Sequence, residues 1–258
     1  MNLNLPGGAY TQEHAHYTTK KRKWNVDSGL LDGIASVLMQ AGCKSVADMG
    51  AGIGHYGETL AALGFGVFSC DGTPGVDEAT GGRVCEKDLS KKQKMGMQWD
   101  AVMSLEVGQF IPKEREKDFV GNLARHAATA VILTWGTPGQ RGQGHVNQKT
   151  PEDVAAMLKE HGFVKNDWLT KLLVKKVVDR RLKRRARVYL RADEKFNPID
   201  TRSQPAAAAR AVLRPARATV PQARQLQSQG GLQRRSTPAP TSQPSLPDGS
   251  PRRKTGGK

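Results

Sequence analysis

The chain has 258 residues, a hydrophobic fraction of 37% and a formal net charge of +16. This length allows one sizeable α/β domain with additional segments. No apolar run reaches the roughly 18–20 residues that a membrane span needs, and the first residues lack a basic stretch followed by an apolar core. We therefore expect a cytoplasmic protein, with the nucleus as the alternative location.

The charge and the cysteines limit the kinds of site. Residues 168–191 contain ten Lys and Arg and one acidic residue, and residues 196–258 contain eleven and two, whereas residues 1–167 are close to neutral. The basic character therefore belongs to the C-terminal third. Three cysteines without a Cys-x-x-Cys spacing argue against a metal site and against a disulfide framework.

Composition divides the chain into three parts. Residues 1–24 are polar and contain four consecutive basic residues at 20–23, which predicts a flexible arm, with a nuclear-import or phosphate-binding patch as the alternative. Residues 25–195 carry the apolar patterns of a folded domain. Residues 196–258 are rich in Pro, Ala, Arg and Gln and have no apolar period, so we predict a disordered basic tail.

The first half of the domain contains a strand–helix–strand unit. Apolar residues recur at helical spacing from Leu30 to Leu38, and Gly42 is a plausible end of that helix. A short buried strand is predicted over 45–49, followed by a glycine-rich turn, a helix from Glu58 to Leu63 and a strand over 67–70. Such a unit predicts a parallel sheet with a right-handed crossover.

The second half continues the alternation of strands and helices. We predict strands over 99–105, 130–135 and 186–190 and a helix over 113–127. A further helix over 151–161 has Pro at its first position and Thr150 as N-cap, and Gly162 and Phe163 close it. The stretch 169–183 is predicted to form one basic amphipathic helix.

The stretch VADMGAGIGHYG, residues 46–57, fits two cofactor patterns. Gly52, Gly54 and Gly57 have the spacing of a dinucleotide site, whereas Asp48 followed by alternating glycines is typical of S-adenosylmethionine (SAM) sites. Both kinds of site use an acid after the second strand, here Asp71, to bind ribose hydroxyls. Asp48 distinguishes the two kinds of site, because a dinucleotide site needs no charge inside the first strand and burying a charge is costly. An NAD(P)-dependent oxidoreductase is therefore disfavoured.

Two further segments extend the candidate cofactor site. Asp88 and the backbone beside Leu89 follow the expected third strand, where they are placed to read an adenine. The segment WDAVMSLEVGQFIP is a strand that ends in the acid Glu106 and is followed by a short helix. The predicted cofactor-binding residues are Asp48, Gly50, Gly52, Gly54, Asp71, Gly72, Asp88, Leu89 and Glu106.

Taken together, VADMGAGIG, Cys70-Asp71, EKDLS and WDAVMSLEVGQFIP resemble the class I, Rossmann-like SAM-dependent methyltransferases. The stretch AVILTWGTPGQRGQGHVN resembles a subgroup with a W-x-x-P-G-Q…G-H-V-N loop. The resemblance covers about residues 25–191. It implies a three-layer α/β sandwich with a seven-stranded, mostly parallel sheet whose last strand is antiparallel, SAM at the C-terminal ends of the strands, and methyl transfer. Many relatives have an acid–His pair where this chain has Gln109-Phe110, which leaves the substrate open.

The glycine-rich loop 136–147 is the expected wall of an acceptor site. His145 is a candidate general base for an acceptor that must lose a proton; in the alternative, His145 and Asn147 fix their own loop through hydrogen bonds. For Trp135 a place in the core is an equal alternative. The predicted substrate-binding residues are Tyr56, Trp135, Gln140 and Asn147.

The predicted function is methyl transfer from SAM to an O or N atom of an unidentified acceptor, with a small molecule or a glycan precursor favoured. The segment after Leu105 is not an Asn/Asp-Pro-Pro-aromatic run, and no Pro-Cys pair occurs, which argues against methylation of adenine or glutamine amino groups and of cytosine C5. The alternative is a non-catalytic Rossmann-like module that binds RNA or another polyanion weakly through residues 168–191 and the tail.

Overall fold

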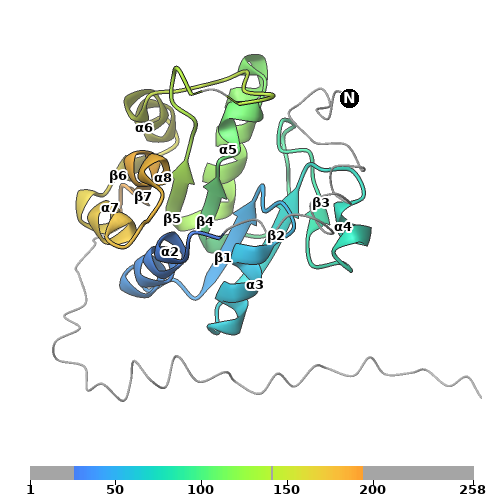
Figure 1. The fold of residues 1–258 in the computed structure, drawn as a ribbon, viewed down its shortest axis with the longest axis horizontal. Coiled ribbons are helices and arrows are strands. Elements are labelled where there is room, and N and C mark those ends of the chain that lie inside the picture. The colour runs from blue at the N-terminus through green and yellow to red at the C-terminus, as the bar shows by residue number, and fades with distance from the viewer. Residues whose placement is uncertain (1–25, 141, 194–258) are drawn as a thin grey trace, which may run out of the picture. The chain divides into compact units, whose positions relative to one another are not determined.

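The computed structural model describes residues 26–140 and 142–193, so the predicted arm and tail lie outside the described residues. The described residues form a seven-stranded sheet in the order β3-β2-β1-β4-β5-β7-β6 (Figure 1). β7 runs antiparallel to β5 and β6, and the remaining pairs are parallel. The predicted fold class is therefore confirmed. The strands are β1 (Ser45–Met49), β2 (Gly66–Asp71), β3 (Cys85–Glu86), β4 (Trp99–Leu105), β5 (Ala127–Thr134), β6 (Phe163–Lys165) and β7 (Arg187–Arg191).

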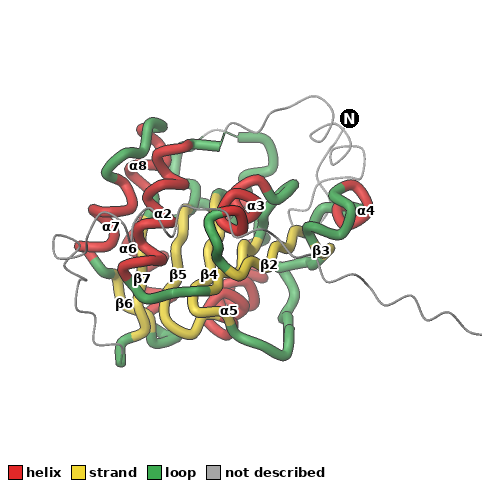
Figure 2. The backbone as a smooth tube through the Cα atoms, turned by 90° about the horizontal axis from the view of Figure 1, so that it is seen from below, coloured by secondary structure: helices red, strands yellow, loops and turns green. Residues whose placement is uncertain are grey.

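Helices cover both faces of the sheet, and Figure 2 shows α3 and α5 on opposite sides of it. One buried cluster includes Phe119 and Leu158 and lies under α5 and α6, whereas the other includes Ile34 and Leu173 and lies under α2, α3 and α7. None of the described helices is long and apolar enough to cross a membrane. The helices are α2 (Ser28–Gln40), α3 (His55–Ala62), α4 (Val76–Ala79), α5 (Glu116–His126), α6 (Pro151–Lys159), α7 (Asp167–Val174) and α8 (Arg180–Arg185), with the 3₁₀ turns η1 (Gly108–Phe110) and η2 (Lys113–Arg115).

The contact of α2 with α7 and with the residues that follow α7 depends on two glycines one helical turn apart. A Cβ atom on Gly29 would lie 1.9 Å from the carbonyl oxygen of Lys176, and one on Gly33 would lie 2.1 Å from that of Leu173. Because a carbonyl oxygen cannot rotate away as a side chain can, glycine is needed at Gly33 for α7 and at Gly29 for the segment after α7 to approach α2 this closely. The sequence pattern gave no sign of this pairing.

The prediction of one helix over 169–183 is wrong, because the structure has α7 and α8 with an irregular connection between them. The backbone N–H groups of Val178 and Asp179 donate to the carboxylate of Asp27, at 3.0 and 2.8 Å, instead of to helix carbonyls. Asp179 then caps α8 with its own side chain. A distant carboxylate thus interrupts a pattern that is helical by its local spacing.

The sequence also missed the short strand β6. Gly162, at φ 78°, makes the turn after α6, as expected, but Phe163 then starts β6, which pairs antiparallel with β7. β5 begins at Ala127, directly after α5 and three residues before the predicted start. β6 itself has three residues, which are too few for an alternating pattern to show in the sequence.

Candidate cofactor and acceptor site

The glycine-rich turn joins the carboxyl end of β1 to the start of α3. Gly50, Gly52 and Gly54 have φ angles of 90°, 57° and 85°, a region that other residues rarely adopt. The N–H groups of Gly50 and Ala51 donate to the carbonyl of Cys70 at 2.8 and 3.0 Å. The turn is therefore fixed to β2 by backbone hydrogen bonds, and its glycines are required by its conformation.

The loop after β4 lies against the same turn. A Cβ atom on Gly50 would lie 2.2 Å from Cγ2 of Val107, so the backbone of the turn is in direct contact with this side chain. β1 is paired with β2 on one side and with β4 on the other, which makes this edge of the sheet a switch point. Ligands of open parallel sheets bind at the carboxyl ends of strands at such points.

Asp71 connects the turn to the end of β2. Its Oδ2 accepts a hydrogen bond from Gly52 N at 2.8 Å, and its Oδ1 accepts from the backbone N and the hydroxyl of Thr73 at 2.9 and 2.7 Å. Gly72 follows as a half-buried residue. The structure thus brings Asp71 to the glycine turn, as the spacing predicts. Thr73, which sequence reasoning missed, helps to orient the carboxylate.

Asp48 is buried inside β1, with 3% of its surface exposed. No hydrogen bond from the described residues reaches its carboxyl group, and Oδ2 lies near Gly57 in the first turns of α3. Burial, together with the nearby charge of Asp71, raises the pKa of Asp48 to about 8. A carboxyl group in this position is costly for folding, so its presence calls for an explanation.

The substitution Asp48→Asn is expected to stabilise the chain, and to do so more at pH 8 than at pH 5. Because the pKa of Asp48 is raised by folding, the folded state holds a proton that the unfolded chain releases, and stability falls as the pH rises from about 4 to about 8. Asparagine has no charge to bury, so the gain at pH 8 is roughly 1–3 kcal/mol. Urea denaturation at both pH values measures it. Asp118→Asn, at a half-buried position on α5, is the control; an equal pH dependence in wild type and Asp48→Asn would contradict the argument.

Asp88 and Leu89 follow β3, close to the end of β2. Burial alone would raise the pKa of Asp88, but hydrogen bonds from Ser90 and the ammonium of Lys91 lower it below its ordinary value. Oδ1 accepts from the N and the hydroxyl of Ser90 at 3.0 and 2.6 Å. The Leu89 side chain packs in the core, with 4% exposed. The adenine-reading role of this pair stays a prediction, which for Leu89 concerns its backbone only.

Glu106 ends β4 in an unusual conformation. Among the described residues other than glycine, it alone has a positive φ, of 59°. Its Oε2 accepts from Arg185 Nη1 at 2.9 Å and from Gln109 Nε2 at 3.3 Å, and its backbone N donates to Thr134 Oγ1 at 2.7 Å. Its Oε1 is completely enclosed by protein atoms, and no hydrogen-bond donor among the described residues reaches it.

The described residues of loop 136–147 are held both by contacts within the loop and by residues outside it, chiefly Gln109, which accepts from the backbone N of Val146 and Asn147 at 2.9 and 3.1 Å. Nδ1 of His145 lies 3.3 Å from the carbonyl of Gln140, and its ring meets the ring of Phe110 edge to face at 5.0 Å. Asn147 is buried and donates to Glu116 at 3.0 Å. These contacts favour the interpretation that His145 and Asn147 fix the loop; the general-base and substrate-binding roles stay predictions. The Gln140 side chain contacts Arg185.

The side chains of Trp135 and Tyr56 both form hydrogen bonds with the backbone of other residues. Trp135 is 3% exposed, donates from Nε1 to the carbonyl of Asn147 at 2.6 Å, and packs edge to face on Phe119. These contacts favour the alternative in which Trp135 is part of the core. The hydroxyl of Tyr56 accepts from Asp27 N at 3.1 Å, and burial is the main cause that raises the pKa of Tyr56 to about 12. A substrate contact from either residue stays a prediction.

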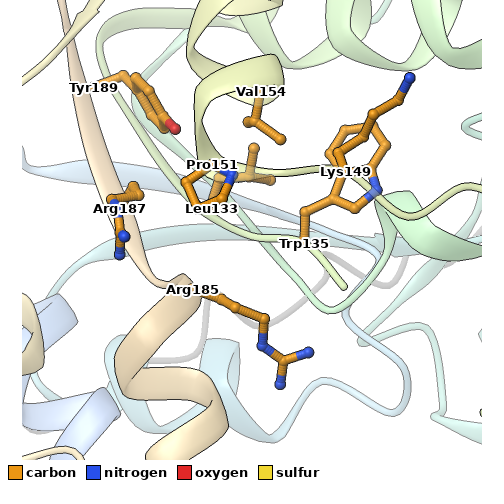
Figure 3. Close-up of a pocket in the computed structure, with 8 residues that line it drawn as sticks. All are labelled: Leu133, Trp135, Lys149, Pro151, Val154, Arg185, Arg187 and Tyr189. Atoms are coloured by element: carbon orange, nitrogen blue, oxygen red, sulfur yellow. The ribbon is translucent and has the colours of Figure 1, made fainter. Parts of the chain in front are cut away.

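A small pocket lies between β5, α6, α8 and β7, and Figure 3 shows its eight lining residues. Three of them are cationic, but Lys149 pairs with Glu116 at 2.8 Å and Arg185 pairs with Glu106 at 2.9 Å. In Figure 3 these two side chains point to different sides of the pocket. Its positive groups therefore do not converge on one bound anion.

The comparisons with known proteins concern the fold. No protein-family model matches the sequence, and no curated protein matches it in sequence. Among solved structures, magnesium protoporphyrin IX methyltransferase (ChlM) from Synechocystis PCC 6803, crystallised with SAM, has 18% identity and a TM-score of 0.52 over 74% of this chain and 100% of that chain. The sugar N-methyltransferase KedS8 from Streptoalloteichus has 15% identity and a TM-score of 0.54 over 70% of this chain and 93% of that chain.

A third neighbour is the SAM-bound amino pentose methyltransferase CalS10 from Micromonospora echinaspora, with 16% identity and a TM-score of 0.50 over 69% of this chain and 96% of that chain. The described chain has the fold of these methyltransferases. The fold places the carboxyl ends of β1, β2 and β4 at one edge, where the turn, Asp48 and Asp71 meet. The methyl acceptors that appear in the names of these three neighbours are the acceptors of those proteins.

The basic segment 168–191 presents an exposed cationic surface on α7 and α8. Lys171, Lys175, Arg180, Lys183 and Arg184 are exposed, and no ion pair holds them within residues 26–140 and 142–193. No nucleic acid is named among the neighbours cited above. Weak binding of nucleic acid or another polyanion stays a prediction.

Proposed function

We propose that the chain is a SAM-dependent methyltransferase that acts on an O or N atom of its acceptor. The observation that carries the proposal is the buried carboxyl group of Asp48, which has no hydrogen-bond partner in the described chain and lies beneath the glycine turn at the switch point. The amino-acid end of SAM carries an ammonium group. A positive group near Asp48 would offset the cost of its burial, so this residue fits that end of the cofactor.

The other predicted residues fit the rest of the cofactor. The Gly50–Gly54 turn lets the backbone come close to a ligand, and Asp71 is fixed beside it at the position where ribose hydroxyls would need an acceptor. Asp88 and the backbone of Leu89 are proposed for the adenine. When bound, SAM supplies a methyl group attached to a positively charged sulfur. The task left to the protein is mainly to align the acceptor and to exclude water.

A small molecule or a glycan precursor is the proposed kind of acceptor. The protein names of the neighbours, which include a protoporphyrin, a sugar and an amino pentose methyltransferase, support this class. The acceptor would enter between the end of β4 and loop 136–147, because the ends of β1 and β2 are taken by the cofactor residues. His145 is proposed as the base if the acceptor must lose a proton.

S-adenosylhomocysteine (SAH), the product of every SAM-dependent methyl transfer, tests the proposal without knowledge of the acceptor. We expect calorimetry to show binding of SAM and SAH in the micromolar range, and no binding of NAD or NADP. Because the ligand ammonium favours the ionised form of Asp48, binding should release a proton at pH 7, and buffers of different ionisation enthalpy measure this release. Absence of heat with both SAM and SAH would exclude the proposed function.

A further inference from the structure

Two features of Glu106 are not explained by its place in the fold. Its Oε1 is buried without a partner among the described residues, and its backbone has a φ of 59°. A buried carboxylate oxygen without a hydrogen bond is costly, and a left-handed conformation adds to the cost for a residue with a side chain. Both costs would be removed by a different residue here, so a ligand is the natural partner for this oxygen.

The contacts of Glu106 come from the acceptor side of the sheet. Thr134 belongs to β5, Arg185 precedes β7, and Gln109 lies in η1, whereas none of the contacts comes from β1, β2 or the glycine turn. The adjacent Val107 contacts Gly50, which places the strand end next to the cofactor turn. Glu106 therefore stands between the proposed cofactor site and loop 136–147, with its side chain directed to the latter.

Arg185 fixes the orientation of the carboxylate. It is 7% exposed, and it contacts Glu106 Oε2, the side chain of Gln140 and, through Nε, the carbonyl of Arg181 at 3.0 Å. Because Oε2 is held by two donors, Arg185 and Gln109, the direction of Oε1 is determined as well. The result is an oriented hydrogen-bond acceptor in a site that excludes water.

We propose that Glu106 Oε1 receives a hydrogen bond from the N–H or O–H group of the methyl acceptor. This inference rests on the proposed function and narrows the acceptor to a molecule that presents such a donor, an amine or a hydroxyl, at the transfer position. It also moves Glu106 from the cofactor contacts expected from sequence to the acceptor contacts. Since Oε1 is shielded in the ligand-free chain, the acceptor displaces a neighbouring side chain as it binds.

The test uses sinefungin, a SAM analogue that carries an amino group in place of the transferred methyl group, and SAH, which carries nothing there. In wild type, we expect sinefungin to bind about tenfold more tightly than SAH, as one additional charge-assisted hydrogen bond gives. In Glu106→Gln, we expect this preference to fall below about threefold and SAH affinity to stay within about twofold of wild type. Calorimetry measures both ligands.

The glutamine variant is informative because the direction of its amide is determined. Arg185 and Gln109 both donate to the Oε2 position, so the amide must place its oxygen there and its NH₂ at the Oε1 position. The substitution thus replaces an acceptor by a donor with little change in shape. Glu106→Asp, which withdraws the carboxylate by one methylene, is expected to lose the preference too, and the exposed Glu114→Gln is the matched control.

Three outcomes would overturn the inference. If Glu106→Gln weakens SAH as much as sinefungin, the residue contacts the cofactor. If both Glu106 variants keep the wild-type preference for sinefungin, Oε1 has no role in holding a donor. If wild type binds neither SAH nor sinefungin, the proposed function fails, and this result is distinct from the first two. Binding of SAH by the variants shows at the same time that they are folded.

Discussion

Gly33→Ala is expected to lower the free energy of unfolding by about 3 kcal/mol or more. The new Cβ atom would lie 2.1 Å from the carbonyl oxygen and 2.8 Å from the carbonyl carbon of Leu173. These are backbone atoms of α7, so the clash is relieved only if α7 moves away from α2. Such a movement would open the cluster that contains Ile34, Leu38 and Leu169. Urea denaturation followed by circular dichroism measures the change.

Gly121→Ala in α5 is the matched control for this prediction. Its Cβ atom would meet nothing closer than the end of the Arg125 side chain, at 3.5 Å, and Gly121 lies in a regular helix. Alanine is favoured over glycine inside a helix by roughly 0.5–1 kcal/mol, so this variant should be slightly more stable than wild type. If Gly33→Ala behaves like Gly121→Ala, the close contact between α2 and α7 does not exist in solution.

Asp71→Ala is expected to weaken SAH binding by about 10- to 100-fold, which corresponds to the roughly 1–3 kcal/mol of a lost hydrogen bond to a buried polar group. The substitution removes the acceptor that holds Gly52 N at 2.8 Å, and with it the contact that fixes the turn to Asp71. It also removes the carboxylate proposed for the ribose hydroxyls. The first loss leaves the turn less well ordered before the ligand binds, the second removes a contact made only in the bound state, and calorimetry measures their sum.

Asp118→Asn is the control for Asp71→Ala, because it also removes an acid, on the outer side of α5. Within the part of the chain that the structure describes, its carboxylate has one long contact, with Arg115 at 3.9 Å, so the substitution should leave SAH affinity unchanged. Circular dichroism at the temperature of the titration confirms that the Asp71 variant is folded. An Asp71→Ala variant that is folded and binds SAH as wild type does would remove Asp71 from the proposed site.

Much of the cofactor side of the site could be predicted from the sequence because its signals are local. The strand, the turn and the helix of residues 45–62 follow one another directly, and the positive φ angles of Gly50, Gly52 and Gly54 account for the glycines. Asp71 ends the next strand of the same unit, and its bond to Gly52 spans 19 residues of sequence. A βαβ unit has one common arrangement, so the spacing was enough to bring these groups together.

The acceptor side could not be predicted in the same way. Arg185 belongs to the run Arg180–Arg185, and in the sequence this run has the composition of a solvated basic surface. The structure buries Arg185 against Glu106, 79 positions earlier in the chain, whereas its neighbour Arg184 is exposed. Which arginine of such a run turns inward depends on where the segment lies on the domain, and local composition holds no information about it.

The sequence by itself determined the α/β class, the strand–turn–helix that would hold a cofactor, and the acids Asp48 and Asp71, because these depend on periodicity and on the backbone freedom of glycine. The tertiary structure alone decided that α7 and α8 are separate, that Gly33 meets the backbone of α7, and that Glu106 keeps one oxygen without a partner. These features depend on contacts between segments far apart in the chain, whose energies arise only when the whole domain is packed.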